Sequence, residues 1–268
     1  MLDGNLEHVL DQLVDISRRA GLAILEWYEG DMGITQKADD SPLTGADLAS
    51  HKLIKAELTR LWPEVPVLSE ESADIPWETR RTWQQYWLVD PLDGTKEFIN
   101  RNGEFTVNIA LIRSHQAVMG VVHVPVTDIS YFGARGAGAF RQQGSGASLA
   151  IRTRQPAATP AIIVGSRSHA NPELASQLNA LGPHELISMG SSLKFCRVAE
   201  GLADFYPRLG PTCEWDTAAA QAVVEAAGGR VVKIDGSPLA YNSKDVYLNP
   251  HFFVIGDPMR DWLGPFQG

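Results

Sequence analysis

Four β-rich runs follow one another along the middle of the chain, and their close spacing restricts the fold more than any other feature. The runs are FTVNIALI (105–112), AVMGVVHVPV (117–126), ISYFGARG (129–136) and GAGAFRQQ (136–143). A parallel connection between neighbouring strands needs about a dozen residues, whereas an antiparallel pair needs only a tight turn. The spacing therefore predicts a mainly antiparallel meander.

Two helices are expected before the meander. Apolar side chains recur near helical spacing from about residue 5 to residue 29, which predicts an amphipathic first helix. Thr44 and Asp47 stand at the spacing of a capping box, and apolar residues follow on one face as far as Leu61. A second helix should therefore begin there and end before Pro63.

The second half of the chain alternates between strand and helix, so we place a domain boundary near residue 156. This divides the chain into an N-terminal α+β lobe, 1–155, and a C-terminal α/β lobe, 156–268. Strands are expected at AIIVGS, ADFYPRL, RVVKIDGSPL and HFFVIG. Helices are expected at NPELASQLNALG, with Asn171 as N-cap, at SSLKFCRVAEGLA, and at WDTAAAQAVVEAAGG. The sum is a mixed α/β protein in layered lobes.

Charge and cysteine content restrict the class of protein. The formal net charge of −9 is unsuited to the backbone of a nucleic-acid polymer. The chain contains Cys196 and Cys213 without a CxxC pair, its N-terminal segment carries acids from position 3, and no apolar stretch approaches a transmembrane span. These features predict a reduced, cytoplasmic protein whose partner is a small molecule. An anion is compatible where cations reverse the local field.

The stretch YWLVDPLDGT places two acids three positions apart at the end of an apolar run. Pro91 bends the chain, so Asp90, the Leu92 carbonyl and Asp93 can point into one small volume, and three such oxygens suit Mg²⁺. The alternative is a turn aspartate followed by an N-cap, Asp93 or Thr95, for the helix TKEFIN. Charges beside a buried strand are costly unless they are paired or bind a metal, which favours the metal site.

Three further stretches carry acids at element boundaries. Glu70 and Glu71 follow the apolar VLS, Asp216 opens an alanine-rich helix, and Asp47 lies in SPLTGAD. Each has an ordinary explanation: a solvated helix start for the glutamates, an N-cap for Asp216 and a capping box for Asp47. Taken with the previous stretch, they form an acid cluster without paired histidine or cysteine. Such a cluster is typical of two-metal phosphoryl transfer.

The chain resembles the inositol monophosphatase-like superfamily of metal-dependent, lithium-sensitive phosphatases over nearly its whole length. The resemblance rests on GITQKADDSPLTGAD, VPVLSEES, YWLVDPLDGTKEFINRNGEFTVNIALI and EWDTAA, while GSRSHA and GSSLKFC resemble its bisphosphate nucleotidase branch. It implies a layered αβαβα sandwich of the inositol monophosphatase and fructose-1,6-bisphosphatase type. It also implies two or three Mg²⁺ ions per site, held by Glu70, Asp90, the Leu92 carbonyl, Asp93 and Asp216.

The same resemblance implies roles in catalysis and substrate binding. Asp47 and Thr95, with Glu70, are expected to activate the attacking water, and the amides of Gly94 and Thr95 lie at a helix start suited to phosphate oxygens. Expected substrate contacts are Leu92, Asp93, Gly94, Thr95, Asp216, Ser168, His169, Ser191, Ser192 and Lys194, with Arg167 and Arg208 for a second phosphate. Alternatives are a solvated edge for Arg208 and a helix-entry cap for His169. No phosphoenzyme is expected, because the spacing of the two acids in DPLDGT departs from D-x-D-G-T.

The reaction implied is hydrolysis of adenosine 3',5'-bisphosphate (PAP) to AMP and phosphate, and of its sulfated analogue PAPS to APS, by a metal-activated water. Such an enzyme clears the by-product of sulfate assimilation. The alternatives are an inositol monophosphatase or another sugar-phosphate phosphatase of the superfamily, and a catalytically silent nucleotide sensor. The family permits a monomer or a homodimer and peripheral attachment to the inner membrane face. Glu214, beside Asp216, departs from the pattern as an added acid expected to alter anion affinity.

Overall fold

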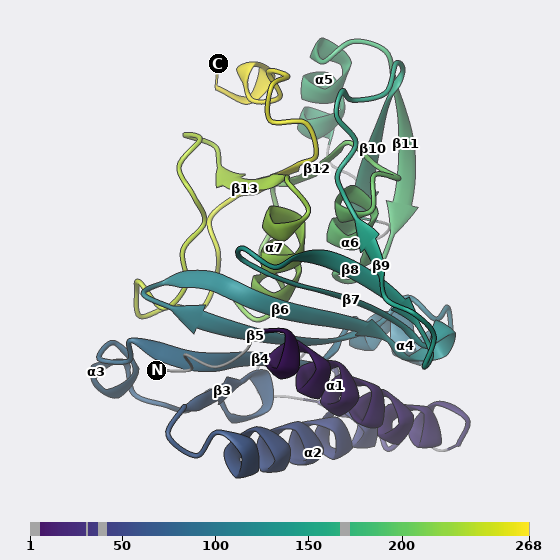
Figure 1. Cartoon of the computed structure of the whole chain (residues 1–268). Helices are drawn as coiled ribbons and strands as arrows, with labels where there is room; N and C mark the ends of the chain where they lie inside the picture. Colours follow the sequence, from purple (N-terminus) through teal and green to yellow (C-terminus); the bar gives the residue numbers. More distant parts are fainter. Residues whose placement is uncertain (1–5, 31, 37–41, 167–171, 268) are drawn as a thin grey trace.

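The computed structural model describes residues 6–30, 32–36, 42–166 and 172–267. In this part of the chain, helices and sheets alternate in five layers, which confirms the αβαβα sandwich (Figure 1). The expected N-cap Asn171 and the expected substrate contacts Arg167, Ser168 and His169 lie outside the described residues.

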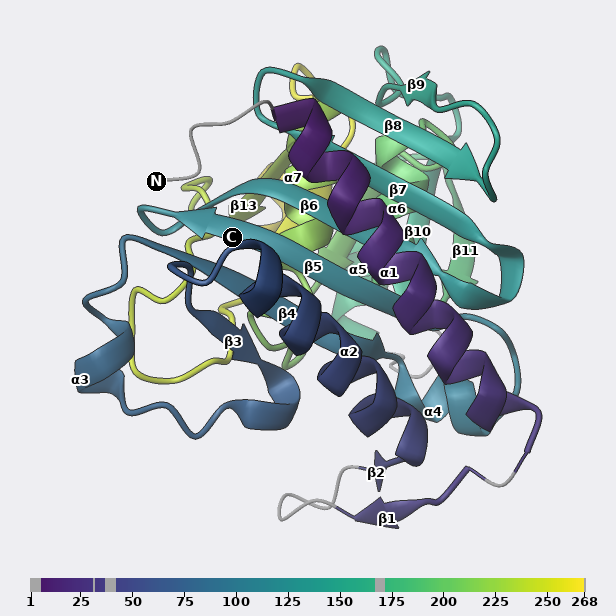
Figure 2. The same ribbon diagram turned by 60° about the horizontal axis from the view of Figure 1, so that its bottom comes forward.

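The first layer consists of two long helices on the outer face of the larger sheet (Figure 2). They are α1 (Leu6–Tyr28) and α2 (Gly45–Leu61), and both match the predicted helices closely. Thr44 is the N-cap of α2, and its capping box with Asp47 is present. Between the helices, β1 (Thr35–Gln36) and β2 (Pro42–Leu43) form a short antiparallel pair that the sequence did not predict.

The second layer is a seven-stranded sheet in which β3 to β9 lie in chain order. The meander is confirmed, because every pair from β4 to β9 is antiparallel, while β3 and β4 are parallel. The strands are β3 (Val67–Ser69), β4 (Gln85–Asp93), β5 (Thr106–Arg113), β6 (Gln116–Val124), β7 (Ile129–Ala134), β8 (Gly138–Gln143) and β9 (Leu149–Ile151). The short helical turns η1 (Glu70–Ser72), α3 (Trp77–Arg80) and α4 (Thr95–Ile99) flank β3 and β4, and η2 (Pro125–Thr127) joins β6 to β7.

The middle layer contains α6 (Leu193–Ala199) and α7 (Ala218–Ala226), both of which are mostly buried. Helix α7 packs against β5, β6, β7, β8 and β13, so it touches both sheets. Close packing depends on Gly120 of β6, since a Cβ there would lie 2.2 Å from the carbonyl oxygen of Ala219. The alanine-rich sequence of α7 therefore fits a helix squeezed between two sheets.

The fourth and fifth layers complete the fold. The smaller sheet has the strand order β11–β10–β12–β14–β13, with α5 (Pro172–Ala180) and η3 (Gly264–Phe266) beyond it. Its strands are β10 (Ala161–Ser166), β11 (His184–Met189), β12 (Phe205–Arg208), β13 (Arg230–Lys233) and β14 (Phe252–Ile255). The sequence did not predict β11, whose residues HELISM are mostly partly or fully exposed at the sheet edge.

Two sequence-based expectations need comment. The strand predicted over RVVKIDGSPL is too long: β13 ends at Lys233, because Asp235 accepts from the Ser237 amide and Gly236 has φ +79° in a turn. The division into lobes at residue 156 remains a prediction, although that residue does lie between β9 and β10. In the described ranges, no helix has the length and hydropathy of a membrane span.

Candidate active site

The strand that carries the two acids is irregular over its last residues. Strand β4 continues to Asp93, and its register against β5 shifts between the pairs Asp90–Asn108 and Asp93–Thr106. Three steps along β4 therefore match two along β5, which is the geometry of a β-bulge. The bulge contains the proline, which has no amide proton to donate to a ladder. A bulge at the end of the strand thus brings the two acids to the edge of the sheet.

Local hydrogen bonds fix this bulge. The Leu92 amide donates to Asp90 Oδ1 at 3.0 Å, and the Ser50 hydroxyl donates to the carbonyl oxygen of Pro91 at 2.7 Å. Ser50 belongs to α2, so the first helix layer holds the bulge from behind. Asp90 is 1% exposed.

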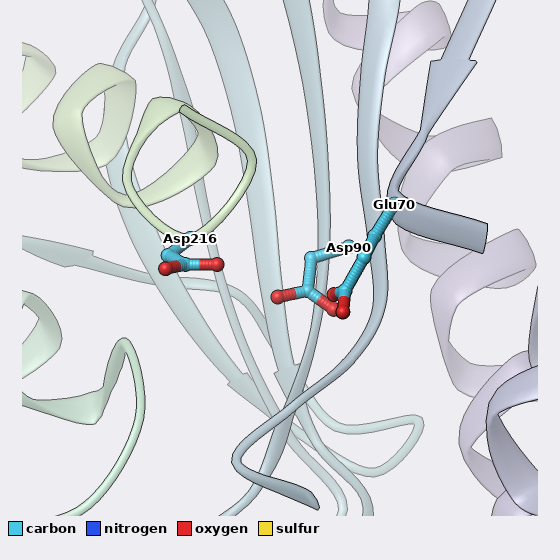
Figure 3. Close-up of side chains that lie close together, drawn as sticks. All are labelled: Glu70, Asp90 and Asp216. Atoms are coloured by element: carbon cyan, nitrogen blue, oxygen red, sulfur yellow. The ribbon is translucent and has the colours of Figure 1, made fainter. Parts of the chain in front are cut away.

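Glu70, Asp90 and Asp216 come together from three separate segments (Figure 3). Each offers a carboxylate oxygen, and these three atoms lie within 4.8 Å of one another. Glu70 opens η1 directly after β3, which is parallel to β4 and so ends beside Asp90. Asp216 approaches from the turn that leads into α7. Oxygen atoms gathered at this spacing suit a hard divalent cation.

The electrostatics of the three acids support that interpretation. Burial, reinforced by the charges of Glu70 and Asp93, raises the pKa of Asp90 well above its ordinary value. Burial raises the pKa of Asp216 in the same direction, with Asp93 and Glu70 again adding to the effect. Carboxylates that repel one another in a desolvated site are stabilised by a positive charge between them. The donor set therefore fits a metal ion.

Asp216 does not cap the helix that follows it. Helix α7 has Thr217 as its N-cap residue and starts at Ala218. Instead, Asp216 Oδ2 accepts a hydrogen bond of 2.8 Å from the Cys213 amide, which fixes the carboxylate over the cleft. The N-cap alternative for Asp216 is therefore wrong.

Asp93 lies beside this group and is held mainly by Ser192. Its Oδ2 accepts hydrogen bonds from the Ser192 amide at 2.6 Å and from the Ser192 hydroxyl at 2.7 Å. Asn108 Nδ2 lies 3.3 Å from the same oxygen and Thr106 Oγ1 lies 3.5 Å away. Asp93 does not belong to the set of three acids whose oxygens all lie within 4.8 Å of one another, although its charge acts on both Asp90 and Asp216.

Thr106 and Asn108 are site residues that the sequence analysis missed. Both are buried, at 0% and 1% exposure, at the start of a strand whose other buried residues are apolar. Alternate positions of a strand face the same side, so two polar residues spaced by two point to one common partner. That spacing was visible in FTVNIALI and could have identified them.

Asp47 and Thr95 meet beside the bulge. Asp47 Oδ2 accepts from the Thr44 amide at 2.8 Å and from its hydroxyl at 2.5 Å, which confirms the capping box. Asp47 Oδ1 is 3.4 Å from Thr95 Oγ1, which is also 3.5 Å from the Leu92 carbonyl oxygen. The cap of α4 is Gly94, with φ +95°, so neither Asp93 nor Thr95 is its N-cap.

A pocket of about 140 Å³ adjoins the acids. It is lined by Asp93, Gly94, Lys96, Glu97, Gly190, Ser191, Ser192, Lys194, Phe195, Tyr206, Arg208, Thr212 and Asp216. Lys194 is only 7% exposed, and its Nζ donates to the Ser191 carbonyl oxygen at 2.6 Å. Burial lowers the pKa of Lys194 to about 8, against the opposing effect of Asp93. The pocket thus contains both acids and cations.

Arg208 and Glu214 differ from their expected settings. Arg208 lines the pocket, where its guanidinium donates to Thr212 Oγ1 at 2.6 Å, so it is more than a solvated edge residue. Glu214 is 0% exposed and accepts from the Asn242 amide at 2.7 Å and from Lys244 Nζ at 3.1 Å. It is not among the lining residues of the pocket, so its expected effect as an added acid beside the anion is not supported.

Comparisons with known proteins agree with this geometry. Residues 5–254 match the model of the inositol monophosphatase family. The 3'(2'),5'-bisphosphate nucleotidase CysQ of Escherichia coli K12 is 52% identical over 249 residues, covering 92% of this chain and 99% of the relative. That of Haemophilus influenzae is 37% identical, covering 97% of each. The crystal structure of CysQ from Bacteroides thetaiotaomicron, described as a bacterial member of the inositol monophosphatase family, superposes with a TM-score of 0.81 at 43% identity, covering 94% of this chain and 98% of that one.

Proposed function

The chain belongs to the inositol monophosphatase family, and from this premise we propose that it is a Mg²⁺-dependent 3'(2'),5'-bisphosphate nucleotidase. It is an enzyme of the phosphatase class. The reaction is hydrolysis of PAP to AMP and phosphate, with PAPS as a second substrate, and the metabolic role is removal of this by-product of sulfate assimilation. The similarity to bisphosphate nucleotidases at 52% identity favours this activity over the sugar-phosphate phosphatases of the same family.

One observation carries the proposal: Asp216 belongs both to the acid cluster and to the lining of a pocket that contains Lys194 and Arg208. The acids suit metal ions beside the phosphate to be cleaved, and the two cations suit a second phosphate nearby. A substrate with two phosphates on one small scaffold matches this pairing better than a monophosphate does.

The metal ions would be held by Glu70, Asp90, Asp93, Asp216 and the Leu92 carbonyl oxygen, and we propose Mg²⁺, with two or three ions per site. Bound divalent cations lower the pKa of a water and neutralise charge on the phosphate oxygens. The oxygen-only donor set and the raised pKa values of Asp90 and Asp216 support a hard cation here.

The chain's own residues supply a path for the proton of the attacking water. When the water oxygen bonds to phosphorus, its proton passes to Thr95 Oγ1, whose own proton passes to Asp47 Oδ1, 3.4 Å away. The phosphorus–oxygen bond to the ribose breaks on the opposite side, its electron pair stays on the ribose oxygen, and a solvent water supplies the proton of the new AMP hydroxyl. The capping-box bonds from Thr44 keep the Asp47 carboxylate aimed at Thr95 through the step. No covalent enzyme intermediate is needed.

The test is phosphate release from PAP in the presence of Mg²⁺, of Mg²⁺ with Li⁺, and of EDTA. Inositol 1-phosphate and fructose 1,6-bisphosphate are measured in parallel at equal concentration. We expect fast release from PAP, inhibition by Li⁺ and no release in EDTA. A preference for either sugar phosphate would overturn the nucleotidase assignment and keep the metal site. Tight PAP binding without turnover would indicate a sensor.

We further propose a cytoplasmic location, where thiols stay reduced, because the chain contains two cysteines, Cys196 and Cys213, without a CxxC pair. The choice between monomer and homodimer remains a prediction, which light scattering at working concentration can test.

A further inference from the structure

One loop between β13 and β14 contacts both of the segments that carry Glu70 and Asp216. This connecting loop comprises residues 241–249, and Figure 2 shows the chain between β13 and β14 passing beside α3. The connecting loop forms no helix or strand, apart from an isolated β-bridge at Leu248. Its conformation is therefore set by the side-chain and backbone contacts that follow.

Three contacts join the connecting loop to the turn that precedes Asp216. The Glu214 amide donates to the Tyr247 carbonyl oxygen at 2.9 Å, and the Asn249 amide donates to the Thr212 carbonyl oxygen at 2.8 Å. The ring of Trp215 lies 5.0 Å from that of Tyr247. The same turn aims the carboxylate through the bond from Cys213 to Asp216. Movement of the connecting loop would therefore move Asp216.

Toward Glu70, the connecting loop holds the chain just beyond η1. The Tyr247 hydroxyl donates to the Ala73 carbonyl oxygen at 2.7 Å, one residue after the turn that Glu70 opens. The Arg80 guanidinium lies 4.3 Å from the Tyr247 ring centroid and donates to Asn242 Oδ1 at 2.7 Å. Tyr247 thus contacts both the segment that follows Glu70 and the turn that precedes Asp216.

Glu214 fixes the other end of the connecting loop. Its carboxylate, 0% exposed, accepts from the Asn242 amide and from Lys244 Nζ. Asn242 has φ +48°, a left-handed conformation that needs support from its surroundings. A buried charge held by two donors of one short loop restrains that loop strongly.

We propose that Glu214 and Tyr247 are positioning residues that set the separation of Glu70 and Asp216 and thereby the affinity for the divalent cation. This inference rests on the metal site of the proposed function and adds two residues that lie outside the acid cluster and the lining of the pocket. Partners that orient metal ligands from behind typically change metal affinity about 10- to 100-fold when removed.

The experiment measures Mn²⁺ binding by calorimetry in the absence of substrate, for Tyr247→Phe, Glu214→Gln and the double variant. Tyr131→Phe is the matched control, because the Tyr131 hydroxyl donates to Glu200 Oε1 at 3.1 Å and neither residue belongs to the acid cluster or the pocket. Urea unfolding in EDTA reports the stability of each metal-free variant. The Mg²⁺ activation constant and the KM for PAP at saturating Mg²⁺ complete the comparison.

We expect Mn²⁺ affinity to fall about 10-fold in each single variant. The fold-loss of Mn²⁺ affinity in the double variant should be smaller than the product of the two single-variant losses, since both residues act through one loop. The KM for PAP at saturating Mg²⁺ should stay within about twofold of the wild type, whereas the control should lose stability and keep its metal affinity. Wild-type Mn²⁺ affinity in Tyr247→Phe and Glu214→Gln would overturn the proposal, as would a wild-type chain that binds no Mn²⁺. A wild-type chain that binds Mn²⁺ and ignores PAP contradicts only the proposed function.

Discussion

Ser192 donates two hydrogen bonds to one oxygen of Asp93, from its amide at 2.6 Å and from its hydroxyl at 2.7 Å. Ser192 precedes α6 in the middle layer, whereas Asp93 ends β4 of the larger sheet. The same hydroxyl oxygen lies 2.6 Å from the carbonyl oxygen of Asp216. A residue expected to contact the nucleotide thus also joins two acids from separate layers.

Replacing Ser192 should therefore lower the affinity of the site for Mg²⁺ more than it weakens nucleotide binding. Ser192→Ala removes the hydroxyl and keeps the hydrogen bond from the backbone amide to Asp93. We expect apparent Mg²⁺ affinity to fall about 10- to 100-fold. Steady-state rates over a Mg²⁺ titration measure the effect. Ser130→Ala is the control. Ser130 lies on β7, is as buried as Ser192, and its Oγ is 2.9 Å from His123 Nδ1. An increase in KM for PAP alone would make Ser192 a simple substrate contact.

The fold was predictable where the sequence pattern repeats. The short turns between β5, β6, β7 and β8 leave an antiparallel meander as the simple solution. Strand β11 escaped prediction, because it is an edge strand whose exposed positions leave little apolar pattern. The short β1–β2 pair was also missed, since two-residue strands carry no periodicity.

The site was predictable only in part, because local sequence does not show which of two roles an acid takes. Asp47 is both the capping-box partner of Thr44 and a neighbour of Thr95, so the capping interpretation of SPLTGAD is confirmed and the catalytic one remains a prediction. The N-cap interpretation of Asp216 was wrong, since one residue later Thr217 takes that place. Glu214 could not be placed at all, because its partners Asn242 and Lys244 lie far along the chain.

The hydroxyl of Thr95 is expected to act in the chemical step. Thr95→Val keeps the side-chain shape and removes the oxygen that lies 3.4 Å from Asp47 Oδ1. We expect kcat for PAP to fall about 10²- to 10⁴-fold with little change in KM, the range for loss of a proton-transfer group. Thr95→Ser restores the hydroxyl and should recover most of the rate. Equal losses in the valine and serine variants would assign Thr95 a packing role instead.

The carboxylate of Asp90 is expected to lower the free energy of unfolding when no metal is bound. Burial and the neighbouring acids raise its pKa in the folded chain, so the unfolded chain gives up this proton at lower pH. The metal-free protein should therefore lose stability as pH rises above about 4, the pKa of an unfolded aspartate. Asp90→Asn keeps an acceptor for the Leu92 amide, which donates to Asp90 Oδ1 at 3.0 Å.

The gain from Asp90→Asn should be on the order of 1 kcal/mol in EDTA at pH 8 and smaller at pH 4. Urea unfolding at the two pH values measures it, and the same variant should show no Mg²⁺-dependent turnover. A variant less stable than the wild type at pH 8 in EDTA would contradict repulsion among the acids.

Lys194 is expected to give the enzyme a basic limb in its pH profile. Its pKa in the free enzyme is lowered to about 8, chiefly by burial, so the ammonium group is charged below this pH and neutral above it. A charged Lys194 in the pocket attracts the second phosphate, and a neutral one does not. The value of kcat/KM for PAP should therefore fall as pH rises through about 8.

The variant Lys194→Gln separates this effect from other titrations. It removes the charge at every pH, so its kcat/KM should be low and flat between pH 7 and pH 9, with the loss mainly in KM. At the alkaline end the wild type should approach the value of the variant, because both then present an uncharged side chain to the phosphate. A basic limb that persists unchanged in Lys194→Gln would assign the titration to another group. A loss confined to kcat would place Lys194 beside the reacting phosphorus rather than the second phosphate.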